Sequence, residues 1–131
     1  MLAHIPSHLS ELPIYKQAIQ IFVLSRSISS YLNQDLCYLH NNGCEDANIY
    51  FSGDIVQQSV SLAPQIINAE LERFSDKKYK HIDSLIHLTN RLYKSCLRLE
   101  KCNSNGNEFI SILRKELKVF KKLQNSWMLT L

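Results

Sequence analysis

Lysine and arginine recur at helical spacing in the last third of the sequence. In the first row, within residues 91–101, successive cations are three or four residues apart. The second row, within residues 114–122, follows after a short gap. That spacing places each row along one side of a helix. Such cations could neutralise phosphates of RNA or DNA in a salt-dependent way that reads little sequence. The candidate nucleic-acid-binding residues are Arg91, Lys94, Arg98, Lys101, Arg114, Lys115, Lys118, Lys121 and Lys122.

The net charge of +3 hides an asymmetry between the two parts of the chain. Residues 1–90 carry six Lys or Arg against nine Asp or Glu, a net charge of −3, whereas residues 91–131 carry nine against three, a net charge of +6. If the two helices are antiparallel neighbours, the rows merge into one basic patch. The plain alternative is a solvated face, because charged residues ordinarily occupy exposed helix positions. Tyr79, Tyr93 and Trp127 could add stacking surfaces, although aromatic residues at these spacings are more often core or subunit-interface residues.

The other reactive residues do not form a catalytic or metal-binding pattern. No nucleophile with a base and an orienting group stands out, and three glycines are too few for phosphate-cradling loops. Cys37, His40 and Cys44 are close together, but a structural zinc site needs about four ligands and no fourth is near. We therefore expect no enzyme, no cofactor and no metal, and we treat an inter-helix metal site as the least favoured alternative. The four cysteines are expected to be reduced thiols.

The elements that must position the basic rows are long helices. The chain is 45% hydrophobic with only three Gly and three Pro, too few turn-forming residues for an all-β protein. Apolar residues at spacings of three and four predict an all-α chain with helices at about 11–33, 48–74, 77–102 and 107–129. We expect residues 1–131 to form one domain, an antiparallel up-down-up-down four-helix bundle. Residues 34–47 are predicted to be a loop, with an extra helical turn at its start as the alternative.

The second predicted helix contains a proline, Pro64, near its middle. An apolar stripe made of Val56, Val60, Ala63, Ile67, Leu71 and Phe74 keeps its phase across that proline. A break would normally reset the phase, so we expect one long helix that is kinked at Pro64. The hydroxyls of Ser59 and Ser61 are expected to bind backbone carbonyls that the kink leaves unpaired.

Three segments give the chain a family resemblance. They are Leu12-Pro-Ile-Tyr-Lys-Gln-Ala, Ser61-Leu-Ala-Pro-Gln-Ile-Ile-Asn-Ala-Glu70 and Phe109-Ile-Ser-Ile-Leu-Arg-Lys-Glu-Leu117. With them the chain resembles the four-helix-bundle proteins encoded in intervening sequences of bacterial 23S ribosomal RNA genes. One departure is Leu71, which stands where that family has glycine. The resemblance implies a homo-pentamer. A related branch, the accessory proteins of diversity-generating retroelements, binds nucleic acid and associates with a reverse transcriptase.

Two functions from different classes follow from these observations. The first is a homo-oligomer that binds RNA or DNA through the basic rows; the second is a protein-interaction scaffold, for a partner such as a reverse transcriptase, that binds no nucleic acid. No apolar run reaches the length of about 18 residues that spans a bilayer, and the N-terminal residues lack the regions of a signal peptide. We expect a cytoplasmic protein with no membrane partner.

Overall fold

The protein is all-helical, as predicted. The computed structural model describes residues 7–39, 47–101 and 107–131, with side chains at 7–31, 54–101 and 108–131. The described ranges contain no strand. Their helices are α1 (Ser7–Ser10), α2 (Pro13–Leu39), α3 (Ala47–Val60), α4 (Leu62–Leu71), α5 (Ser75–Glu100) and α6 (Asn107–Met128).

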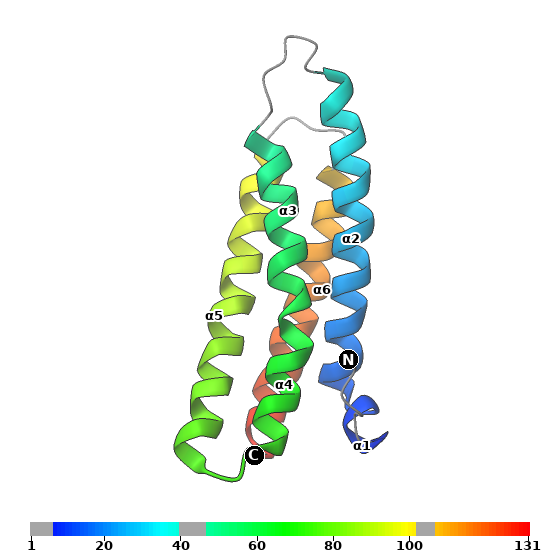
Figure 1. Cartoon of the computed structure of the whole chain (residues 1–131). Helices are drawn as coiled ribbons and strands as arrows, with labels where there is room; N and C mark the ends of the chain where they lie inside the picture. The colour runs from blue at the N-terminus through cyan, green and yellow to red at the C-terminus, as the bar shows by residue number, and fades with distance from the viewer. Residues whose placement is uncertain (1–6, 40–46, 102–106) are drawn as a thin grey trace.

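The long helices lie side by side along one direction. Figure 1 shows α2 and α5 running toward the top of the view, while α3, α4 and α6 run toward the bottom. Helix α2 packs against α3 and α6, and α5 packs against α3, α4 and α6. None of the described helices is apolar over a stretch long enough to cross a bilayer.

Helix α2 is longer than the sequence analysis predicted. It begins at Pro13, where a missing amide costs nothing because the first-turn amides of a helix lack partners anyway. It continues to Leu39, so the predicted loop at 34–47 is wrong for residues 34–39. The reason is that Leu32, Leu36 and Leu39 extend the apolar spacing of four and three. The turn-forming Asn-Asn-Gly sequence comes only later, outside the described residues.

The predicted single helix over 48–74 is two helices, α3 and α4, separated at Ser61. Pro64 is the cause, because its ring clashes with the carbonyl four residues earlier, that of Val60, the last residue of α3. Ser61 keeps helical dihedral angles, with φ −85° and ψ −9°, so α4 continues close to the path of α3. The hydroxyls bind carbonyls earlier in α3 and not the Val60 carbonyl that Pro64 leaves without its usual donor: Ser59 Oγ donates to Val56 O at 3.0 Å and Ser61 Oγ to Gln57 O at 3.3 Å.

The buried side of α3 and α4 is only partly the predicted one. Of the predicted stripe, Val60, Leu71 and Phe74 are exposed, whereas Ala63 is buried in the core and Val56 packs against it. The segment contains a second series at spacings of four and three, which also keeps its phase across Pro64 and is the series that packs inward. Its members are Ile55, Ser59, Leu62, Ile66 and Ala69. The predicted helix end at 74 is also wrong, since α4 ends at Leu71 and a carboxylate oxygen of Glu72 accepts from the next two amides.

The remaining stripes form the core largely as predicted. On α5 the buried residues include Ile82, Leu85, Thr89, Leu92, Cys96 and Leu99, which follow the spacing of three and four. On α6 Leu113, Leu117, Phe120 and Trp127 are buried, whereas Phe109 is exposed and Ile110 takes the inward position. Apolar side chains of α2 to α6 join in one cluster. That cluster leaves the basic rows of α5 and α6 on the outside.

Candidate functional site

Seven of the nine candidate cations are exposed. On and just after α5 they are Arg91, Lys94, Arg98 and Lys101, and on α6 they are Lys115, Lys118 and Lys122. We call these seven residues the basic surface. Their ammonium and guanidinium groups are accessible to a ligand because the apolar stripes of the same helices occupy the inward positions.

Arg114 and Lys121, the other two candidates, lie at the junction between α6 and α5. Arg114 Nε donates to Glu100 Oε1 at 2.8 Å, and both side chains are partly buried. Hydrogen bonds with Tyr93 and with Glu100 raise the pKa of the Arg114 guanidinium. Lys121 Nζ lies 4.5 Å from the centroid of the Tyr93 ring, a cation–π contact. These two cations therefore hold the helices together. No spacing in the sequence indicated the pair between Arg114 and Glu100.

The two rows border α5 on opposite sides. Arg91 lines a groove that α5 forms with α4, and Arg98 lies two helical turns further along the same side. The α6 cations lie on the other side, where Arg114 contacts α5. Lys94 and Lys101 are seven residues apart and lie on the outward side of α5, between the side that borders α4 and the side that borders α6. The basic surface thus curves around α5 and does not form one flat strip.

The three acidic residues of the last third leave most of the basic surface unneutralised. Glu100 is engaged by Arg114, and Glu116 accepts a hydrogen bond from Gln17 Nε2 at 2.6 Å on the side of α6 that faces α2. Glu108 lies in the first turn of α6, where the positive end of the helix dipole stabilises a carboxylate. In the described residues no ion pair joins Lys115, Lys118 or Lys122 to these carboxylates.

A polar groove lies between α4 and α5, and its volume is about 380 Å³. One wall comes from α4 with the residue just before it, and the other from α5. The lining residues are Ser61, Gln65, Ser84, His87, Leu88 and Arg91. Of these residues only Arg91 was a candidate in the sequence analysis. Spacing along one helix does not indicate which sides of α4 and α5 lie against each other.

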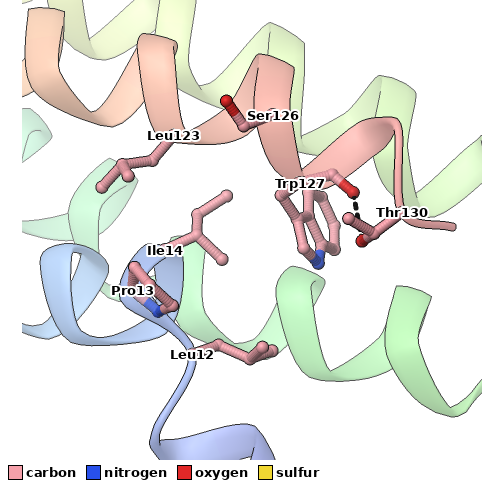
Figure 2. A pocket seen from close by; sticks show the side chains of 7 residues that line it. All are labelled: Leu12, Pro13, Ile14, Leu123, Ser126, Trp127 and Thr130. Atoms are coloured by element: carbon pink, nitrogen blue, oxygen red, sulfur yellow. Dashed lines mark hydrogen bonds between the residues drawn. The ribbon is translucent and has the colours of Figure 1, made fainter.

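An apolar pocket of about 200 Å³ lies where the start of α2 meets the end of α6. Figure 2 shows Leu12, Pro13 and Ile14 across a gap from Trp127, whose carbonyl accepts from Thr130 Oγ1 at 2.7 Å. The Trp127 indole Nε1 donates to Glu70 Oε2 at 2.6 Å. The lining of this pocket is mostly apolar, with Ser126 and Thr130 as its hydroxyl-bearing residues, and it contains no base.

The aromatic residues considered for stacking differ in exposure. Trp127 is 5% exposed and Tyr93 is half-buried beneath Lys121, so neither presents a free ring face. Tyr79 is 65% exposed, but it lies near the start of α5, away from the basic surface. Binding through the basic surface would therefore depend on charge and not on base stacking.

The described residues contain no group of three His, Cys, Asp or Glu side chains that could hold a metal ion. The side chains of Cys37, His40 and Cys44 lie outside them. Cys96 is a free, buried thiol. Burial, with the nearby charge of Glu100, raises its pKa from 9.0 to about 12 against the opposing charge of Arg114. Because thiolate is the reactive form, Cys96 is inert at neutral pH.

The raised pKa of Cys96 predicts a loss of stability at high pH. The unfolded thiol ionises from pH 9 and the folded thiol only near pH 12, so the folded state binds more protons between these values. Across this window the free energy of unfolding of the natural chain should fall relative to that of Cys96→Ala, by up to about 1.4 kcal/mol per pH unit. Urea unfolding of both proteins at several pH values measures the difference. Parallel curves would contradict the burial of this thiol.

No protein-family model matches this chain, and neither a curated protein nor a solved structure matches it. The resemblance to the intervening-sequence proteins therefore depends on the three quoted segments, and it stays a prediction. In the described part of the chain, the exposed basic surface, the apolar pocket between α2 and α6 and the polar groove between α4 and α5 are features that could bind a ligand.

Proposed function

We propose that this protein is a non-enzymatic, homo-oligomeric helical protein that binds the phosphate backbone of RNA or DNA through its basic surface. We propose further that α2, α3 with α4, α5 and α6 act as the four members of an antiparallel up-down-up-down bundle, as in the family it resembles. The observation that carries the proposal is the exposure of lysines on α5 and α6. Lys94, Lys101, Lys115, Lys118 and Lys122 form no ion pair within the described part of the chain.

The chemistry of these lysines favours phosphate over other partners. Each ammonium group is a hydrated point charge on a flexible stem, which suits a backbone contact and not the reading of base edges. Binding of this kind releases counterions from the nucleic acid and weakens steeply with salt. The proposal is therefore binding with little sequence preference.

Self-association is supported by an apolar face that α2 and α6 share and that adjoins the basic surface along α6. It consists of Ile19, Val23 and Tyr31 of α2 with Phe109, Ile112 and Val119 of α6, all exposed. The rings of Tyr31 and Phe109 lie 5.3 Å apart between centroids, so the two helices contribute to one surface. We call these six residues the apolar face. Exposed apolar surface of this kind is typical of protein interfaces, and the resemblance implies a pentamer.

The alternative function uses the same apolar face differently. A protein partner, such as a reverse transcriptase, would cover it, and the lysines would serve solubility alone. The observation that favours this scaffold is the small number of charges along α2, whose described side chains include only Lys16 and Arg26 as cations and no carboxylate. A measurement of nucleic-acid binding distinguishes the two functions, because the scaffold does not bind nucleic acid.

Replacing Lys115, Lys118 and Lys122 by Gln should weaken RNA binding about tenfold or more and should lower the slope of log affinity against log salt by about 2 to 3. The reason is the loss of three phosphate contacts. Fluorescence anisotropy of a labelled structured RNA, measured at about 50 and 200 mM salt, gives both quantities. The matched control replaces Lys77, Lys78 and Lys80 by Gln. These lysines lie in the first turns of α5, and their replacement removes the same amount of charge.

Two outcomes of this experiment would contradict nucleic-acid binding by the basic surface. One is no binding of the natural chain at low salt. The other is an equal loss in both triple variants, since that would follow from net charge and not from position. Retention of a protein partner after nuclease treatment, together with no RNA binding, would favour the scaffold.

Replacing Val23 and Val119 by Lys should dissociate the oligomer. Val23 is 57% exposed and Val119 45% exposed in the single chain, so the substitutions leave its core intact and place charge only in the proposed interface. Light scattering at micromolar concentration should give a multiple of the chain mass for the natural protein and the monomer mass for the variant. The control, Leu71→Lys with Phe74→Lys, should stay assembled. A monomer mass for the natural chain would refute self-association.

A further inference from the structure

We propose that the polar groove between α4 and α5 binds one phosphate group with the nucleoside attached to it. This deepens the proposed function, and the identification of a nucleotide as the phosphate carrier rests on it. The groove itself is argued from its own residues. Five of its six lining residues are polar, and none is acidic.

Arg91 supplies the charge of this site. Its side chain is exposed, it lines the groove, and no ion pair joins it to a carboxylate in the described residues. Arg114 on α6 is different, because Glu100 already neutralises it. A guanidinium group presents five donors in a planar fork that matches the oxygens of a phosphate. Arg91 is therefore the cation in this groove that is available to an anion.

The polar neighbours of Arg91 add donors. Gln65 Oε1 lies 3.2 Å from His81 Nδ1, so its carbonyl oxygen is already engaged and its NH₂ group remains to donate. Ser84 and His87, one helical turn apart on α5, supply a hydroxyl and an imidazole N–H. Ser61 already donates its proton to Gln57 O, so its oxygen can only accept there. The set favours a ligand that accepts hydrogen bonds and carries negative charge.

The size of the groove indicates more than a bare phosphate ion. Its volume of about 380 Å³ lies at the lower end of the range of small-molecule sites, roughly 300 to 1,000 Å³. Leu88 gives the lining one apolar surface, against which a sugar or base could pack. A mononucleotide unit fits this combination. It could come from a free nucleotide or from one residue of a single strand.

The test is a titration of the ¹⁵N-labelled full chain with uridine 5′-monophosphate in phosphate-free buffer, followed by NMR. Saturable shifts are expected at Ser84, His87 and the Gln65 side-chain amide, and uridine without phosphate should give none. Arg91→Gln should bind about tenfold more weakly, as expected for loss of a charged hydrogen bond. The control Arg26→Gln removes the same charge from α2, outside the basic surface, and should bind within about twofold of the natural chain.

Equal shifts with uridine and its monophosphate would overturn this site, as would equal nucleotide affinities of the Arg91 and Arg26 variants. Either result would leave RNA binding by the α6 lysines intact. Conversely, nucleotide binding in the groove by a chain that binds no RNA at low salt would reject the proposed function and retain the site. If Arg91→Gln binds single-stranded RNA more weakly than Lys115→Gln does, the mononucleotide unit in the groove comes from an RNA strand. If the two variants bind RNA equally while the natural chain binds uridine 5′-monophosphate, the ligand of the groove is a free nucleotide.

Discussion

The structure depends on one constraint: each long helix has to bury an apolar side against its neighbours. Burial releases water from apolar surface, worth roughly 25 cal/mol per Å². Because α5 and α6 bury residues such as Leu92 and Leu117 completely, their charged residues are left on the remaining sides. Hydrogen bonds between side chains fix the alignment of neighbouring helices, as in Thr89 with Gln124 and Ser95 with Gln58. The basic surface is thus a consequence of the packing.

The same packing gives the cations different roles. Arg114 and Lys121 lie against α5 and serve the helix junction, through Glu100 and the Tyr93 ring. The outward lysines have no such partner in the described residues and keep their charge for a ligand. Arg91 stands apart, because it faces α4 across a polar groove. The chain therefore has a diffuse basic surface and, beside it, a small polar groove that is open to solvent.

The sequence could predict the all-helical class and the exposure of most of the basic surface, because both follow from apolar spacing along single helices. It could not predict the break at Ser61, since continuous phase across Pro64 is compatible with one helix or two. It selected a partly wrong inward stripe there, because that segment holds two apolar series and only the position of α5 decides between them. The groove with Arg91 and the pair between Arg114 and Glu100 join different helices, so no local pattern indicates them.

The central claim, that the basic surface contacts the nucleic-acid backbone, is tested most directly by mapping the contacts. The full chain would be photo-cross-linked to a structured RNA containing 4-thiouridine at low salt, and the cross-linked peptides would be identified by mass spectrometry. We expect cross-links within residues 91–101 and 114–122, and fewer in the lysines at 77–80. Cross-links confined to residues 77–80, or to the apolar face of α2, would contradict the claim.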